Sequence, residues 1–200
     1  MKEQAPDPFG RRSIRLKGYD YSQAGGYCIT IVSFRREYLF GELLGGEMQV
    51  NALGRIVKDC WGEIPVHFPN VVLDAFVVMP NHVHGIIFIH DDNRATASSR
   101  RGTIYRAPTL PHRASTSAIE QFGKPTVGSL STIIRTVKAS VTRRAGGKLN
   151  SANLWQRNYY EHILRDQSDY ERIAGYILDN PLNWAKDEEH PHNQGDDIFP

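Results

Sequence analysis

Two histidines separated by a single valine, His82 and His84, stand at the start of an apolar run that ends near Ile89. This run and the apolar residues before it are short and rich in Val, Ile and Phe, which favours two strands, and Pro80-Asn81 predicts the turn between them. Residues two apart in a strand share a face, so the imidazoles point the same way, about 7 Å apart at Cα. Such a pair can share one metal ion. The spacing alone leaves open a second interpretation, two hydrogen-bonded structural histidines.

A second pair of candidate residues lies on the last predicted helix. Ser168 and Glu171 predict a capping box at its start, and Pro181 ends it. Tyr176 and Asn180 are four residues apart and lie beside each other, about 6 Å apart, off the main apolar face. If this helix crosses the sheet face that bears the histidines, a nucleophile and a neutral oxygen ligand meet them. The alternative is a boundary tyrosine and a helix-ending asparagine.

The remaining predicted elements position these four residues. The sequence predicts a first strand over 27–34, a helix with apolar residues from 53 to 61 capped by Asn51, a helix with apolar residues from 130 to 141 stopped by Gly146-Gly147, and a last strand within 154–164.

Composition favours one soluble domain with extensions. The chain has 200 residues, 40% of them hydrophobic and 23% charged. Cys28 and Cys60 are far apart and in no metal-type spacing, which favours a reducing compartment. No N-terminal apolar segment follows Met1, and no apolar run reaches the roughly 18 residues that span a bilayer. We therefore expect a cytoplasmic protein with no membrane partner.

Charge divides the chain into a basic body and an acidic end, although the net charge is only +2. We predict a basic N-terminal arm over 1–26, a main domain over 27–184 with a flexible basic insert at about 91–125, and an acidic, solvated tail over 185–200. A basic body suits a nucleic-acid partner. The candidate DNA-binding residues are Arg11, Arg12, Arg15 and Lys17 in the arm, Arg135 and Lys138 beside the apolar face of their helix, and Arg157. Solvated basic side chains are the alternative.

The chain resembles the REP-associated tyrosine transposases, single-tyrosine members of the HUH endonuclease superfamily. The resemblance rests on RRSIRL with YDY (11–16 and 19–21), VVMPNHVHG (77–85), WQRNYYEH (155–162) and YILDNPL (176–182). By the resemblance, His82 and His84 match the metal-binding pair, Tyr176 the nucleophile and Asn180 the third metal ligand. The insert at 91–125 lies outside it.

This resemblance implies a ferredoxin-like α+β fold, the HUH endonuclease fold, with helices packed on an antiparallel sheet. It implies cleavage and rejoining of single-stranded DNA at palindromic-repeat hairpins. Tyr176 attacks the phosphorus, leaving a free 3′-OH and a 5′-phosphotyrosine link. Mg²⁺ or Mn²⁺ is the expected cofactor. Related proteins include monomers and homodimers, and we expect a monomer.

Three other functions use parts of the same residue set. A metal-dependent phosphodiesterase would use the histidines and a water molecule, without Tyr176. A non-catalytic protein could bind the hairpin only. A replication initiator or relaxase would share the superfamily fold, although the chain is short for one and lacks a helicase-type phosphate loop. Tyr159 and Tyr160 are alternative nucleophiles.

Overall fold

The computed structural model describes residues 19–91, 126, 128–146 and 154–193. The basic run at 11–17, most of the predicted insert and the last seven residues lie outside this part of the chain. Within the described part, no helix is both long enough and apolar enough to cross a membrane.

A four-stranded sheet forms the centre of the fold. Its strands are β1 (Gly25–Val32), β4 (Val71–Val78), β5 (His82–Ile89) and β6 (Tyr160–Leu164), in the order β4-β5-β1-β6, and all neighbours are antiparallel. With a helical segment before β4 and a helix before β6, the chain follows the strand–helix–strand–strand–helix–strand plan of a ferredoxin-like fold. The predicted α+β architecture is confirmed.

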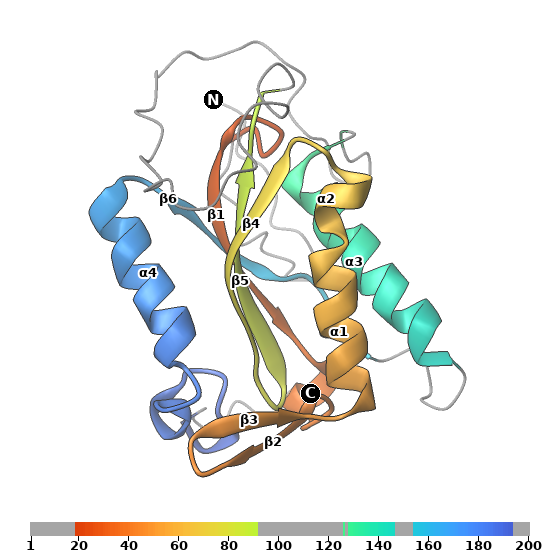
Figure 1. The fold of residues 1–200 in the computed structure, drawn as a ribbon, viewed down its shortest axis with the longest axis vertical. Coiled ribbons are helices and arrows are strands. Elements are labelled where there is room, and N and C mark those ends of the chain that lie inside the picture. Colours follow the sequence, from red (N-terminus) through yellow and green to blue (C-terminus); the bar gives the residue numbers. More distant parts are fainter. Residues whose placement is uncertain (1–18, 92–125, 127, 147–153, 194–200) are drawn as a thin grey trace, which may run out of the picture.

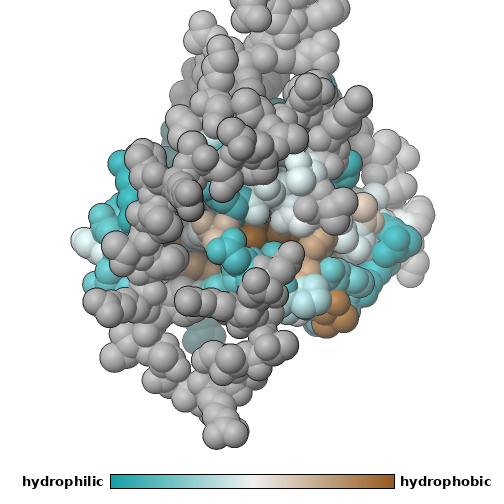
Figure 2. Space-filling model, turned by 90° about the horizontal axis from the view of Figure 1, so that it is seen from above, coloured by the Kyte–Doolittle hydropathy of each residue, from teal (hydrophilic) through white to brown (hydrophobic). Residues whose placement is uncertain are grey.

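Helices cover both faces of this sheet (Figure 1). On one face lie α1 (Ala52–Gly62) and α3 (Leu130–Ala145), and on the other lies α4 (Gln167–Asp179). The short α2 (Ile64–His67) follows α1 and contacts β4. Seen from above, apolar colour shows between hydrophilic groups of described residues (Figure 2), as expected for a core enclosed between layers.

The ends of two helices form as predicted. Asn51 caps α1 by accepting a hydrogen bond from the backbone N–H of Gly54 at 3.0 Å. Gly146 follows α3 with φ of 62°, a conformation that glycine adopts without steric cost.

One predicted helix start is wrong, and one element was not predicted. The N-cap of α4 is Asp166, whose carboxylate accepts from the N–H of Asp169 at 2.9 Å, so Ser168 already lies inside the helix. The last strand, β6, lies within the predicted range 154–164 and takes up its second half. A hairpin of β2 (Gly41–Leu44) and β3 (Glu47–Val50) turns at Gly45-Gly46, both with positive φ, as a two-residue hairpin turn requires.

Alternation along β5 decides which residues face which helices. Val83 and Ile87 pack in the cluster that α1 and α3 share, whereas Ile86 and Phe88 pack beneath α4. Gly85 also faces α1, because a Cβ placed on it would lie 2.3 Å from Cζ2 of Trp61. The absent side chain therefore lets the indole ring lie against β5, directly behind the two histidines.

We expect Gly85→Ala to reduce the free energy of unfolding by about 1–3 kcal/mol, because the Trp61 ring or the strand must shift. Urea denaturation measures the change. Gly175→Ala, inside α4, is the matched control. Nothing lies within 4 Å of its added Cβ, so its free energy of unfolding should rise by about 0.5–1 kcal/mol. Equal stability of Gly85→Ala and wild type would show that the close packing is not required.

Candidate functional site

The histidine pair sits at the beginning of β5, on the face that α4 partly covers. His82 is fully buried, His84 is 5% exposed, and their ring centroids are 4.4 Å apart. Nδ1 of His82 lies 2.9 Å from the side-chain oxygen of Asn81, and Nδ1 of His84 lies 2.8 Å from the hydroxyl oxygen of Thr30. The Asn81 oxygen can only accept, so His82 carries its proton on Nδ1 and keeps a lone pair on Nε2. The Thr30 hydroxyl can hold His84 in the same tautomer.

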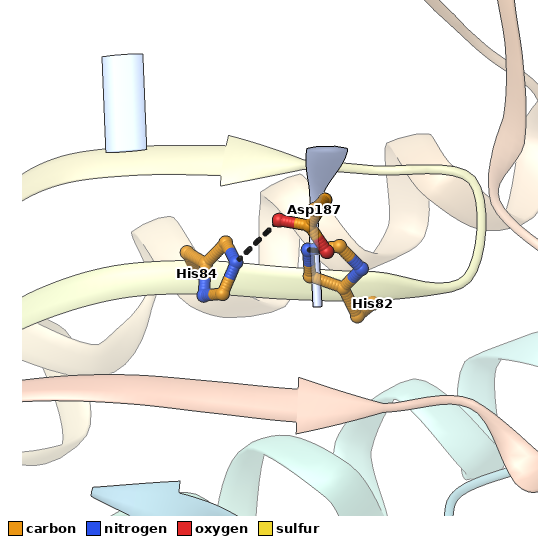
Figure 3. A group of neighbouring side chains, drawn as sticks. All are labelled: His82, His84 and Asp187. Carbon is orange, nitrogen blue, oxygen red and sulfur yellow. Dashed lines mark ion pairs between the residues drawn. The ribbon is translucent and has the colours of Figure 1, made fainter. Parts of the chain in front are cut away.

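Asp187 completes a group of three metal-type ligands. Its carboxylate oxygens lie 3.8 Å from Nε2 of His82 and 3.8 Å from Nε2 of His84. Figure 3 shows both imidazoles on β5 turned toward this carboxylate. A separation of 3.8 Å is too long for a hydrogen bond, but two ligands that each lie about 2.1 Å from one ion are separated by such distances.

Two buried atoms support this interpretation. Among the described residues, neither Nε2 of His82 nor the side-chain oxygen of Asn180 has a hydrogen-bond partner. Buried polar atoms normally have a partner, and an unpaired one costs free energy. A divalent ion held by the imidazoles and Asp187, with Asn180 beside them, would satisfy the imidazole nitrogen and suits this donor set.

The predicted meeting of helix and sheet is present. Tyr176 projects from α4, and its hydroxyl donates to Asp187 at 2.7 Å and lies 3.5 Å from Nε2 of His84. Asn180 follows one turn after the buried Ile177 and is itself buried, with its amide nitrogen donating to Asp187 at 2.6 Å. The structure thus brings all four sequence-predicted site residues together, while their chemical roles stay predictions.

Burial and charge set the protonation states. Burial lowers the pKa of His82 well below its usual value, and the neighbouring His84 acts in the same direction against Asp187. Burial raises the pKa of Asp187, but the facing imidazoles of His84 and His82 and the hydrogen bonds from Asn180 and Tyr176 outweigh it and hold that pKa low. Burial and the hydrogen bond to Asp187 raise the pKa of Tyr176. At neutral pH the site therefore holds a neutral His82, an ionised Asp187 and a protonated phenol.

Asp187 is the site residue that the sequence did not reveal. The segment after α4 was expected to be a solvated acidic tail, but Asp187 is 3% and Glu189 8% exposed, so this expectation is wrong for both residues. Glu189 pairs with Arg36 at 2.8 Å, and its carbonyl accepts from the Asn81 amide at 2.8 Å. The sequence shows only that a carboxylate follows the helix closely, and the spacing of Asp187 from the other site residues matches no known motif.

The predicted DNA-binding residues are dispersed. Arg11, Arg12, Arg15 and Lys17 lie outside the described residues, and Arg135 and Arg157 are exposed. Lys138 is tied to the protein, because its ammonium donates to the carbonyl oxygens of Gln156, at 2.9 Å, and Asn158. Burial lowers its pKa to about 8. DNA contact by any of these residues stays a prediction.

We expect the metal-free protein to bind Mn²⁺ at this site. Single replacements of His82, His84 or Asp187 by Ala should weaken the affinity more than tenfold, because each removes a ligand. Electron paramagnetic resonance of free Mn²⁺ during a titration measures the affinity. His162→Ala is the control, since His162 pairs with Asp169 at 2.7 Å and is absent from the ligand group. Unchanged affinity in all three variants would contradict the assignment.

We also expect a pH dependence of stability that originates in His82. In the unfolded chain His82 takes up a proton near pH 6.5, but in the folded protein only at a lower pH. Its contribution to stability is therefore complete above pH 6.5 and is lost as the pH falls, by up to about 1.4 kcal/mol per pH unit. Urea denaturation in EDTA between pH 7 and pH 5 should show this slope in wild type and a shallower one in His82→Gln. Parallel curves would refute it.

Comparisons with known proteins identify a relative by sequence and a solved structure of similar fold. No protein-family model matches the chain. A protein of Haemophilus influenzae (strain Rd), described as an uncharacterized protein, is 43% identical over 178 residues, which are 89% of this chain and 92% of that protein. The structure of a REP-associated tyrosine transposase bound to a REP hairpin has a TM-score of 0.54 and 16% identity, over 95% of this chain and 94% of that chain. At this identity the likeness is one of fold.

Proposed function

We propose that this chain, which belongs to the family of the Haemophilus influenzae protein and has the fold of a REP-associated tyrosine transposase, is a DNA transposase. It would cleave and rejoin single-stranded DNA at palindromic-repeat hairpins through a tyrosine nucleophile. One observation carries the proposal: the Tyr176 hydroxyl of α4 lies within 3.5 Å of both Asp187 and His84. A phenol at a metal-type site is the arrangement that a covalent phosphotyrosine mechanism needs.

The residues divide the reaction between them. The Tyr176 oxygen attacks the phosphorus, an O–P bond forms to the protein, and the bond to the 3′ oxygen breaks. The leaving 3′ oxygen takes up a proton, so the products are a free 3′-OH and a 5′-phosphotyrosine. His82, His84 and Asp187, with Asn180 beside them, would hold Mg²⁺ or Mn²⁺. Such an ion supplies charge neutralisation at the phosphate. The same step run backwards by another 3′-OH joins strands.

The phenolic proton must leave Tyr176 during the attack. Populating an ordinary tyrosinate at pH 7 costs about 4 kcal/mol, and burial and Asp187 raise the pKa of Tyr176 further. Two acceptors lie near the phenol: the Asp187 carboxylate at 2.7 Å and, farther away, Nε2 of His84 at 3.5 Å. While Tyr176 is still protonated, its hydrogen bond to Asp187 orients the phenol before the attack.

Two observations support a substrate and a state of assembly. The transposase of similar fold is bound to a REP hairpin, which supports a DNA hairpin as the substrate of this chain. Tyr176, Asn180, Asp187 and both histidines come from one chain, so the site needs no residue from a second copy. This supports a monomer as the catalytic unit.

We expect wild-type protein, with Mn²⁺ and a labelled single-stranded DNA hairpin of palindromic-repeat sequence, to form a covalent adduct visible on a denaturing gel. Tyr176→Phe should abolish the adduct, because the nucleophilic oxygen is gone. Tyr160→Phe is a closely matched control: the exposed fractions of Tyr160 and Tyr176 are 43% and 44%, and both residues lie on the same side of the sheet.

The other outcomes of this assay identify the rival functions. If Tyr176→Phe forms the adduct and Tyr160→Phe does not, the nucleophile is Tyr160 of β6 and not Tyr176. Metal-dependent cleavage without any adduct would indicate a phosphodiesterase that uses water. Tight binding without cleavage, in Mn²⁺ as in EDTA, would indicate a hairpin-binding protein.

A further inference from the structure

A short segment between β1 and β2, residues 34–38, lies beside the candidate metal site and has no role in the mechanism above. It is held against the turn that precedes His82. The N–H of Ser33 donates to the Asn81 carbonyl at 2.8 Å, and the Asn81 amide donates to the Arg36 carbonyl at 3.3 Å. The Ser33 hydroxyl donates to the Glu37 carbonyl at 2.7 Å. The residue that orients His82 thus also fixes this segment.

The backbone of the segment is strained. Arg35 and Arg36 have φ of 53° and 55°, in the left-handed region that residues with a Cβ avoid. Two such residues in succession are uncommon, because each is disfavoured by roughly 1–2 kcal/mol. Conformations of this kind persist where the surroundings hold them, and they cluster at ligand clamps. Here the hydrogen bonds from Ser33 and Asn81 hold the strained conformation.

Aromatic rings lead from the site to the surface at this segment. The ring centroid of Trp184 lies 5.8 Å from that of His82, and Tyr38 packs edge-on against Trp184 at 6.0 Å. Tyr38 is 52% exposed, so about half of the residue is accessible to a ligand. Nucleobases stack on exposed rings of this kind, with little dependence on base identity.

The two arginines of the segment differ in their surroundings. The Arg36 guanidinium pairs with the buried Glu189, so its charge is already compensated within the protein. Arg35 is exposed, and its guanidinium lies over the Phe34 ring, 5.2 Å from the centroid. A guanidinium held in place by a ring is ready to pair with a phosphate.

We propose that residues 34–38 bind the unpaired nucleotides next to the cleaved phosphate, with Tyr38 stacking on a base and Arg35 contacting a backbone phosphate. This inference rests on the proposed function, because it takes the cleaved strand as the ligand. It names a binding site for single-stranded DNA that is separate from the metal ligands and from the predicted basic residues. The strained backbone at Arg35 and Arg36 then serves to hold the side chains of Arg35 and Tyr38 at the edge of the proposed catalytic site.

The test separates base stacking from phosphate binding by using two DNA hairpins in EDTA, where cleavage does not interfere. One hairpin carries unpaired nucleotides beside the cleavage position, and the other carries abasic sites there. Fluorescence anisotropy gives Kd for each. Wild type should bind the intact hairpin about 5-fold to 100-fold more tightly than the abasic one.

Tyr38→Ala should remove this preference, by weakening binding of the intact hairpin while leaving the abasic hairpin unchanged. Unchanged abasic binding also shows that the variant is folded. Tyr38→Phe should restore the preference, because a phenyl ring stacks as well. Val66→Ala, at the 76% exposed Val66 of α2, is the control for loss of exposed apolar surface and should keep the preference.

Arg35→Gln should weaken both hairpins alike and should reduce the slope of log Kd against log salt by about 0.7, the value of one phosphate contact on a single strand. Lys58→Gln, an exposed charge on α1, should leave the slope unchanged. A Tyr38→Ala protein that keeps the wild-type preference, or an Arg35→Gln protein with the wild-type slope, overturns the corresponding half of the proposal.

The adduct assay on the same preparations separates this inference from the proposed function. If wild type forms the Tyr176-dependent adduct but Tyr38→Ala keeps its preference for unpaired bases, only the binding site is wrong. If wild type forms no adduct, the transposase function fails, and the binding site fails with it as a site for the cleaved strand.

Discussion

The buried carboxylate of Asp187 is the contact on which the candidate site depends. It accepts hydrogen bonds from the Tyr176 hydroxyl, the Asn180 amide and the backbone N–H of Glu189, and it faces both imidazoles. A buried carboxylate is costly unless polar groups surround it. Two of these donors, Tyr176 and Asn180, belong to the proposed chemistry, so the hydrogen bonds that satisfy Asp187 also hold the proposed nucleophile beside the histidines.

The sheet supplies the other half of the site by simple alternation. Even-numbered residues of β5 face α4 and odd-numbered ones face α1. The strand therefore places both imidazoles on the α4 side, while Gly85 on the α1 side leaves room for the Trp61 ring. Asn81 and Thr30 then fix the imidazoles through their Nδ1 atoms. Ligands held in this way need little reorganisation when an ion or a phosphate arrives.

The sequence predicted what depends on local pattern. Apolar alternation and Pro80-Asn81 gave the hairpin that carries the histidines, and helical spacing placed Tyr176 and Asn180 near each other. The cap of α4 was misassigned because Ser168 and Asp166 both offer a side-chain oxygen, and the carboxylate two residues earlier is the one that caps. The hairpin of β2 and β3 was missed although Gly45-Gly46 lies between two short alternating segments, a signal that was available.

Asp187 and the segment 34–38 could not be predicted, for a different reason. Asp187 lies more than 100 residues from His82 in the chain and reaches it through a 3₁₀ turn, Trp184–Lys186, that follows α4. The hydrophobic periodicity of a sequence does not predict the direction in which such a turn places the following side chain. The left-handed conformations of Arg35 and Arg36 could not be predicted from the sequence either, because arginine does not favour them.

Charge balance explains why a neutral amide suits position 180. With His82 neutral and the Arg36–Glu189 pair compensated, Asp187 contributes the one uncompensated negative charge among these groups. A divalent cation would leave the group with a single positive charge, which a single phosphodiester neutralises. A carboxylate at 180 would cancel that positive charge beforehand and would repel the phosphate in a buried setting where charges interact strongly. The neutral asparagine, whose amide nitrogen donates to Asp187, thus preserves the attraction for the DNA backbone that the proposed reaction requires.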